Sequence, residues 1–187
     1  MRENFQRNYL YEGYKNENEN DLIMISDIDE IPDPKKLANF NLKNKYACFV
    51  QKNFQQKLNL LNTTHPNWYG TKICIKKFLK SPQWLRDIKM KKSFWKIYKP
   101  NPPQLIFDGG WHFSFVKNSK NISNKIKSYA HQEYNKDKFH NINSINDKIS
   151  QNKDILERDF NYMKIELDNS YPDFILNNKE TLKEWIL

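Results

Sequence analysis

The feature that most constrains the fold is a short apolar run that ends abruptly at acidic residues. Residues 21–26 read Asp-Leu-Ile-Met-Ile-Ser, and the sequence continues Asp-Ile-Asp-Glu. A continuous apolar run of this length, bounded by polar residues, is typical of a strand buried on both faces, as in a parallel sheet. Asp33 and Pro34 then supply an N-cap and a first-turn proline, which predict a helix to about Phe40. The sequence therefore predicts a strand, an acidic turn and a helix, as in α/β folds.

Further elements are predicted on both sides of this unit. Helical spacing of aromatic residues indicates a helix within residues 3–15, and Ser81 followed by Pro82 indicates another helix start. Additional strands are expected at residues 46–51, 57–61, 71–78, 105–107 and 111–116. Helices are expected from Ser119, after Ser144 and from 172 to 187, and the polar stretch 135–152 is a linker or an exposed helix. A chain of 187 residues fits a single domain, 1–187.

The composition indicates a folded protein without a membrane span. Hydrophobic residues make up 38% of the chain and aromatic residues 14%, more than disordered chains carry. No apolar stretch approaches the length of about 20 residues that crosses a bilayer, and the first residues have no apolar signal core. Cys48 and Cys74 lie in apolar runs without zinc-site spacing, so they are expected to be core residues. We therefore expect a cytoplasmic protein in a reducing compartment.

The net charge of +9 favours anionic partners in principle. Nucleic acid, an anionic membrane surface and phosphorylated substrates all fit such a charge. The lysines are dispersed among asparagines, however, and no recognised nucleic-acid-binding motif accompanies them. We expect them on solvated faces that keep the protein soluble, and we expect no nucleic-acid partner.

Asp27 and Asp29 are the first candidate site residues. In open α/β sheets, ligands bind beyond the carboxyl ends of the strands, which is where these two residues fall. Two carboxylates two positions apart can bind a divalent cation directly or through water, and such a cation also takes phosphate oxygens from a nucleotide. The alternative is that both are ordinary turn residues or N-caps of the following helix.

The segment 108–113 is the second candidate region. Asp108 follows an apolar run and precedes Gly109 and Gly110, which let the backbone bend closely around a ligand. Its carboxylate is a candidate general base, with the alternative that it only stabilises the glycine turn. Trp111 and His112 are candidate substrate-binding residues, since an aromatic face stacks on a sugar and imidazole supplies a hydrogen bond. Strand geometry places their side chains on opposite faces.

Three runs of the sequence carry a resemblance to a known family. They are residues 20–32 (NDLIMISDIDEIP), 109–114 (GGWHFS) and 125–135 (KIKSYAHQEYN). In this order they resemble glycosyltransferase family 17, whose eukaryotic members include the enzyme that adds the bisecting N-acetylglucosamine to N-glycans. The end of the chain, from residues 171–179 through Trp185, also resembles the end of that family, so the resemblance spans nearly the whole chain.

This resemblance implies a fold, a reaction and partners. The fold would be a GT-A-like, Rossmann-related α/β domain, and the reaction an inverting transfer of N-acetylglucosamine from a uridine-diphosphate donor to a glycan hydroxyl. Asp27 and Asp29 match the family's Asp-x-Asp motif, which implies Mn²⁺ or Mg²⁺ as cofactor. Family members carry further sequence upstream, so the domain is expected to be truncated at its amino terminus, with a companion chain as one source of the missing strands. A catalytically inactive glycan- or nucleotide-binding remnant is the alternative.

Other residues have less defined roles. Glu133 is a second candidate base, and His131 is a candidate metal or diphosphate ligand or else a capping or core histidine. The aromatic residues near Trp68 and Trp84 are expected to pack in the core. Arg86 is an exception among them, because its planar guanidinium suits a diphosphate or a carboxylate partner.

Overall fold

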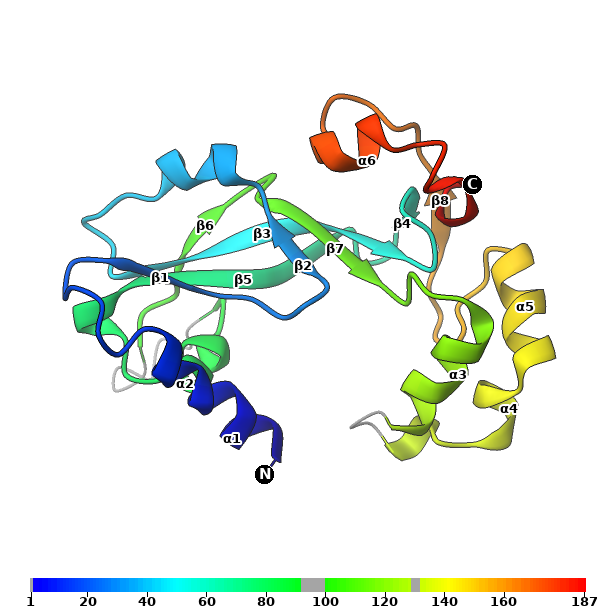
Figure 1. Cartoon of the computed structure of the whole chain (residues 1–187), viewed down its shortest axis with the longest axis horizontal. Helices are drawn as coiled ribbons and strands as arrows, with labels where there is room; N and C mark the ends of the chain where they lie inside the picture. The colour runs from blue at the N-terminus through cyan, green and yellow to red at the C-terminus, as the bar shows by residue number, and fades with distance from the viewer. Residues whose placement is uncertain (1, 92–99, 129–131) are drawn as a thin grey trace. The chain divides into compact units, whose positions relative to one another are not determined.

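The structure is a computed structural model that describes residues 2–91, 100–128 and 132–187. It is a mixed α/β protein, as expected (Figure 1). The chain divides into two compact units. Unit 1 comprises residues 1–51 and 68–111, and unit 2 comprises residues 52–67 and 112–187. A single domain over residues 1–187 stays a prediction.

Unit 1 is built on a mixed sheet. Its strands are β1 (Leu22–Ile25), β2 (Glu30–Pro32), β3 (Tyr46–Gln55), β5 (Asn67–Ile75), β6 (Gln104–Ile106) and β7 (Gly110–Ser114), of which β3, β5 and β7 have residues in unit 2 as well. In this sheet β1 pairs antiparallel with β5, β5 lies beside β3, and β3 pairs in parallel with β6. A further pairing joins β2 to β7 (Figure 1). The acidic turn between β1 and β2 is therefore tied to the sheet at both of its ends.

The strands buried on both faces are β3 and β5, not β1. Successive side chains of a strand point to opposite faces, so Cys74 packs in one cluster while Ile73 and Ile75 pack in the other. In β1, buried Ile23 and Ile25 alternate with exposed Leu22 and Met24. The prediction of a doubly buried strand at residues 21–26 was wrong in this respect. Among the described strands β1 pairs with β5 alone, so it lies at the end of its sheet. The face that carries Leu22 and Met24 is exposed.

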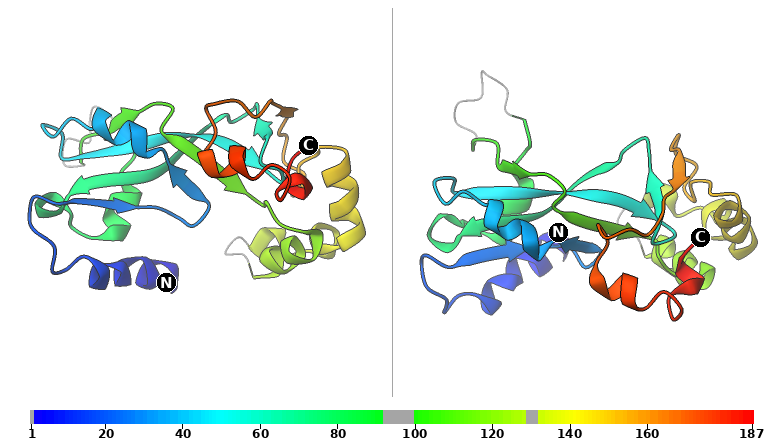
Figure 2. Two further views of the ribbon diagram at one scale, coloured as in Figure 1. Left: turned by 45° about the horizontal axis from the view of Figure 1, so that its top comes forward. Right: turned by 90° about the horizontal axis from the view of Figure 1, so that it is seen from above.

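Short helices with recognisable caps surround the sheet of unit 1. They are α1 (Arg2–Tyr9), η1 (Leu10–Gly13), η2 (Pro34–Asn39), η3 (Lys76–Phe78) and α2 (Pro82–Asp87). The Ser81 side chain caps α2 by accepting from Trp84 N–H, and Asp33 caps η2 by accepting from Lys35 N–H, as the sequence predicts. The element after Asp33 is a 3₁₀ helix. Figure 2 shows α1 lying beside α2, so unit 1 brings these two helices together.

Unit 2 combines short strands with a helical subcluster. Its own elements are β4 (Leu60–Asn62), β8 (Tyr162–Lys164), α3 (Ser119–Lys127), η4 (Gln132–Tyr134), α4 (Asp137–His140), α5 (Ile142–Ser150), α6 (Asp173–Asn177) and η5 (Lys183–Trp185). The helical core is formed by Phe115, Ile122, Ile126, Phe139, Ile145, Ile155 and Leu156. The polar stretch 135–152 is thus largely helical, and Ile145 anchors it in this core.

Both cysteines are buried free thiols, which confirms their expected role as core residues. Cys48 lies in β3 and Cys74 in β5, so both belong to unit 1. Within the described ranges, no helix is both long and apolar enough to span a membrane.

Candidate functional site in unit 1

The acidic turn begins where β1 ends. The chain passes through Asp27 and Asp29 and enters β2 at Glu30. The side chain of Asp27 is 41% exposed, whereas the side chain of Glu30 is fully buried. The backbone N–H of Asp27 donates to Glu30 Oε2 at 3.1 Å, and the Ser26 hydroxyl donates to the Glu30 carbonyl at 2.8 Å. The turn therefore carries one carboxylate that is open to solvent and one that is buried.

Arg86 joins these two carboxylates. Its Nη1 and Nη2 donate to the two oxygens of Glu30, each at 2.9 Å, which is the bidentate geometry that a guanidinium favours. Nη2 also donates to Asp27 Oδ2 at 2.9 Å. Burial lowers the pKa of Arg86, but the bonds and charges of Glu30 and Asp27 outweigh it, and the net pKa is raised. Arg86 is thus bonded to two carboxylates, and its role in binding a substrate diphosphate stays a prediction.

A second arginine reaches Asp27 from α1. Arg7 Nη2 donates to Asp27 Oδ1 at 3.3 Å, while its Nη1 donates to Gln83 Oε1 at 2.7 Å. Because α1 packs beside α2, the two arginines approach Asp27 from neighbouring helices. Both oxygens of Asp27 are therefore engaged. Sequence reasoning missed Arg7, since the sequence indicates a helix there but gives no sign of what that helix contacts.

Trp68 belongs to the site and not to the core. Its Nε1 donates to Glu30 Oε1 at 2.9 Å, and the residue is 38% exposed, so the expectation of core packing was wrong for it. The polar network continues inward from Ser26 to the hydroxyl of Thr71 at 2.6 Å, and from there to Gln51 Nε2 at 3.2 Å. In the described part of the chain, buried Gln51 Oε1 has no hydrogen-bond partner.

The glycine segment of the second motif lies against the strand that leaves the acidic turn. The backbone N–H of Asp33 donates to the carbonyl of Gly109 at 2.9 Å. Gly110 has φ of +130°, and a Cβ there would lie 2.1 Å from the carbonyl oxygen of Ile31. Only glycine permits this approach of two backbones. Asp108 precedes this contact as an exposed residue with φ of 49°. Unit 1 therefore brings the glycine segment against the end of β2, the strand that follows the acidic turn, although the two are far apart in the sequence.

The remaining predicted site residues are placed differently. Trp111 is buried and is the last residue of unit 1. His112 belongs to unit 2, where it is 5% exposed and its Nδ1 lies 3.0 Å from Asn53 Oδ1. Glu133 is exposed in η4 of unit 2. His131 lies outside the described residues. Unit 1 thus contains five of the predicted site residues, namely Asp27, Asp29, Arg86, Asp108 and Trp111.

The side chains near Asp27 limit how many protein ligands a divalent cation could have there. Among the described residues, no three histidine, cysteine or acidic side chains form a metal-ligand group. Mg²⁺ is commonly bound by one or two carboxylates, with water and substrate phosphates as its other ligands. Each carboxylate oxygen has two lone pairs, so Asp27 can accept a cation on its exposed side while it bonds the arginines. Asp27 is thus the more exposed of the two carboxylates that Arg86 bonds, and two guanidinium groups engage its oxygens.

No family model matches the chain, and no curated protein or solved structure matches it either.

Proposed function

We propose that this chain is a sugar-transferring domain that binds a nucleotide-sugar donor through Mn²⁺ or Mg²⁺ at Asp27 and Asp29. The observation that carries this proposal is the pairing of β2 with β7. Through it the glycine segment lies against the strand that follows the acidic turn, so the two segments that carry the sequence resemblance belong to one unit. The same proposal assigns the mixed α/β fold to the GT-A-like group and takes N-acetylglucosamine as the sugar and a glycan hydroxyl as the acceptor.

The charges of the site suit a diphosphate bound beside a cation. A bound divalent ion would neutralise the departing diphosphate. Arg86 is fixed by Glu30 and Gly70, so it orients the Asp27 carboxylate and places a permanent positive charge next to it. The contact from Arg7 to Asp27 is the longest of these bonds, at 3.3 Å, so it is the one most easily exchanged for a phosphate oxygen.

Asp108 is the proposed base, and Glu133 is the second candidate. In an inverting transfer, the base takes the proton from the acceptor hydroxyl while the new glycosidic bond forms and the bond from the sugar carbon to the diphosphate breaks. Asp108 is exposed and lies in unit 1 beside the glycine segment, so its carboxylate is open to an acceptor. Glu133 is exposed as well, but it belongs to unit 2.

The outer edge of β1 is open to pairing with a further strand. The carbonyl of Asp21 accepts from Lys76 N–H, so in the antiparallel register the backbone groups of Leu22 and Met24 point away from β5. Such a row of outward N–H and C=O groups can pair with a further strand. A strand added there would lie next to the one that delivers Asp27.

A donor-hydrolysis assay tests the proposal. We expect the full chain with Mn²⁺ to release the diphosphate from uridine-diphosphate N-acetylglucosamine, and we expect a chelator to abolish this release. Asp29→Asn should reduce the rate at least about a hundredfold, since removal of one charged group that stabilises a leaving group commonly costs this much. Asp173→Asn, which changes an exposed acid of α6, is the matched control. Turnover that is unaffected by the chelator and by Asp29→Asn would contradict the proposal.

The alternative is a non-catalytic remnant that binds a glycan or a nucleotide. It is favoured by the engagement of both Asp27 oxygens by arginines in the structure. Calorimetry with uridine diphosphate separates the two functions. Saturable binding without hydrolysis or transfer supports the remnant, whereas binding with metal-dependent turnover supports the enzyme.

A further inference from the structure

The positive charge of the chain is concentrated in its middle. Residues 34–86 contain ten lysines and one arginine and no acidic residue, whereas residues 1–33 contain nine acidic and three basic residues. An asymmetry of this kind is typical of chains that contact a nucleic acid or an anionic membrane surface. The fold then decides whether these lysines gather on one surface.

Four of the lysines gather at the end of the unit 1 sheet where β1 and β3 begin and β5 ends. We call them the basic rim, and they are Lys43, Lys45, Lys77 and Lys80, all exposed. The first two precede β3, and Ile75 N–H at the end of β5 donates to the Lys45 carbonyl at 3.2 Å. The other two lie in η3 and just after it. Both views of Figure 2 show the turn before β3 and the turn after β5 at the same end of the sheet.

Two aromatic rings support three of these ammonium groups. The Nζ atoms of Lys45 and Lys77 lie 5.1 and 5.5 Å from the ring centroid of Phe78. Lys80 Nζ lies 5.7 Å from the ring centroid of Trp84. Phe78 packs against both core clusters of unit 1 and Trp84 against one of them, so both rings are anchored from below. Since an aromatic face attracts a cation placed over it, the rings hold charges from two segments close together.

Carboxylates do not neutralise the basic rim in the described part of the chain. Lys76 is paired with Glu19 at 3.1 Å and is therefore not counted in the rim. Lys77 Nζ donates to the neutral Asn20 Oδ1 at 2.8 Å. The other three rim lysines form no ion pair with a described acidic residue.

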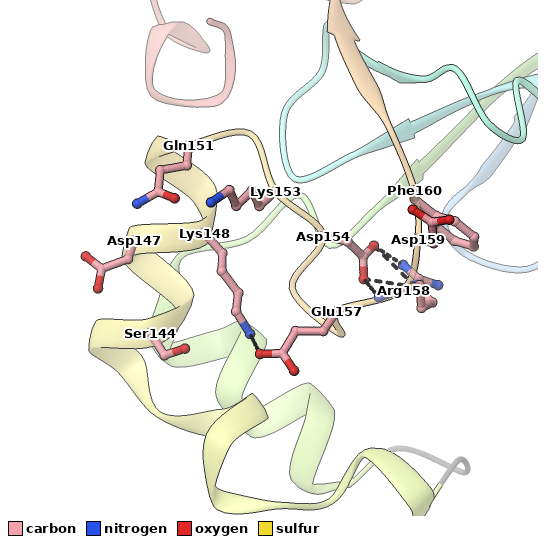
Figure 3. Close-up of a pocket in the computed structure, with 10 residues that line it drawn as sticks. All are labelled: Ser144, Asp147, Lys148, Gln151, Lys153, Asp154, Glu157, Arg158, Asp159 and Phe160. Carbon is pink, nitrogen blue, oxygen red and sulfur yellow. Dashed lines mark hydrogen bonds and ion pairs between the residues drawn. The ribbon is translucent and has the colours of Figure 1, made fainter.

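Cations that line the polar pocket of unit 2 are paired instead. Figure 3 shows Lys148 bonded to Glu157 and Arg158 bonded to Asp154, at 3.0 and 2.6 Å. Lys138 also pairs with Glu157. These charges are satisfied within unit 2, whereas those of the basic rim remain available to a partner.

A leucine projects from the turn that carries the first two rim lysines. Leu42 is 65% exposed and follows Asn41 in a β-turn, in which Asn44 N–H donates to the Asn41 carbonyl at 2.8 Å. Gln104 fixes this turn, because its Oε1 accepts from Asn41 N–H at 3.0 Å and from Asn44 Nδ2 at 3.1 Å. Its Nε2 also donates to a backbone carbonyl just before the turn at 2.7 Å. The apolar side chain is therefore presented to solvent by a held turn.

We propose that the basic rim and Leu42 form a docking face for an anionic lipid bilayer. The lysines contact the negatively charged headgroups, and Leu42 enters the boundary between headgroups and acyl chains. A nucleic acid fits this face less well, because its phosphate backbone offers no apolar phase to a leucine. Phe78 and Trp84 are half-buried under lysines, so they also present no free face for base stacking. The inference rests on unit 1 alone and holds whether or not the chain transfers a sugar.

Co-sedimentation of the full chain with vesicles tests the inference. The probes are vesicles of phosphatidylcholine alone and vesicles in which about one third of the lipid is phosphatidylserine. We expect binding to the anionic vesicles and little binding to the neutral ones. Raising the salt from about 0.1 M to about 1 M shortens the Debye length from about 10 Å to about 3 Å, so it should release most of the bound protein.

Lysine variants separate a local face from the overall charge. The rim variant combines Lys43→Gln, Lys45→Gln and Lys80→Gln. It should lower the partition onto anionic vesicles about a hundredfold, since each lysine at such a surface contributes about fivefold. The matched control loses the same charge at exposed positions of unit 2, through Lys164→Gln, Lys179→Gln and Lys183→Gln. We expect the control to lower the partition by less than about threefold.

Leu42→Asn tests the apolar part of the face. It should lower the partition about tenfold, because the apolar side chain no longer leaves water on binding. Phe174→Asn is the control, since it replaces a 69% exposed apolar residue of α6 and should leave the partition unchanged. Both residues are exposed, so both variants should fold, and thermal unfolding checks that they do.

Four results would overturn the inference. They are no binding to the anionic vesicles, equal binding to neutral and anionic vesicles, equal losses in the rim variant and its control, and an unchanged partition of Leu42→Asn. Binding of a single-stranded oligonucleotide that depends on the rim lysines, in place of vesicle binding, would assign these lysines to nucleic acid. None of these results bears on donor hydrolysis at Asp27, so the two proposals can fail separately.

Discussion

At the scale of single residues, Arg86 determines how the acidic turn of unit 1 is held together. Its side chain is 13% exposed, and it bonds the fully buried Glu30 and the open Asp27. Removing one partner of a buried ion pair leaves an uncompensated charge in the interior, which is far more destabilising than losing a surface pair. Arg86 is thus a positioning residue for Asp27 as well as a stabilising residue.

The first prediction concerns this pair. Arg86→Met should lower the free energy of unfolding by about 3 to 5 kcal/mol, because Glu30 keeps its buried charge without a partner. The double variant Arg86→Met with Glu30→Gln should recover most of this loss, since the buried charge is then absent. Urea unfolding followed by circular dichroism measures both. A double variant no more stable than Arg86→Met would show that the ion pair is not the cause.

The second prediction concerns Lys72, which is buried in β5 and donates to the carbonyls of Arg86 and Ile88 at 2.6 and 2.8 Å. Burial, above all, lowers the pKa of Lys72 from 10.5 to about 8. Between these pH values the unfolded chain binds more protons than the folded one, so the contribution of Lys72 to stability rises with pH. The free energy of unfolding of the wild type relative to Lys72→Met should therefore increase by about 2 to 3 kcal/mol from pH 7 to pH 11.

Urea unfolding of both proteins at several pH values checks this second prediction. Subtracting the two curves removes the titration of shared residues that do not interact with Lys72, whereas Cys48, whose pKa the charge of Lys72 lowers, contributes to the difference. A difference that stays constant, or that falls as the pH rises, would contradict the assigned burial of Lys72.

At the scale of elements, the sequence predicted where helices and strands occur better than it predicted which strands pair with one another. The helix starts at Ser81 and Asp33 follow from local capping chemistry, and both caps are present. The apolar run of β1 gave a strand, but its length alone did not reveal whether it is central or at the end of a sheet. The position of β1 in the sheet depends on which distant strands pair with it, and a local sequence pattern does not show this.

The same limit applied to the site. Asp27 was predicted as a site residue from its place in an acidic cluster, and Arg86 from the planar shape of its guanidinium. The pair Gly109 and Gly110 indicated the turn beside Asp108. Arg7 and Trp68 carried no local signal, since each acquires its role only through a contact with a distant segment. Aromatic content led to the prediction that Trp68 packs in the core, whereas its indole N–H in fact serves the buried carboxylate of Glu30.

The third prediction tests the pairing of β2 with β7. Gly110→Ala should be destabilising by more than about 1 kcal/mol, because its φ of +130° strains any other residue and its Cβ would lie 2.1 Å from the Ile31 carbonyl. Gly13→Ala is the matched control, since a Cβ there meets nothing within 4 Å. We expect the control to change the stability by less than about 0.5 kcal/mol. Equal effects of the two substitutions in thermal unfolding would argue against the close backbone contact.

At the scale of the whole molecule, the two units have separate cores. The clusters of unit 1 lie on the two faces of its sheet, whereas the core of unit 2 is formed mainly by α3, α4 and α5. The proposed donor site and the proposed docking face for a bilayer both belong to unit 1. The two cysteines both belong to unit 1, so their reactivity reports on this unit alone.

The fourth prediction uses the two buried cysteines. Burial raises the pKa of Cys48 to about 11 and that of Cys74 to about 12, so neither forms a reactive thiolate near neutral pH in the folded protein. We expect iodoacetamide at pH 8 to leave both unmodified in the native chain and to label both in urea. A cysteine introduced by Lys179→Cys on the surface should react within minutes and serves as the control. Rapid native labelling of either natural thiol would contradict the described core.

Because both sulfur atoms lie inside unit 1, alkylation can proceed only when that unit opens. The labelling rate, read by mass spectrometry, then gives the opening free energy of the donor-site half without a dye or an engineered tag. Added nucleotide should slow this reaction if it binds the folded unit 1, so the two natural thiols form an intrinsic ligand-screening assay.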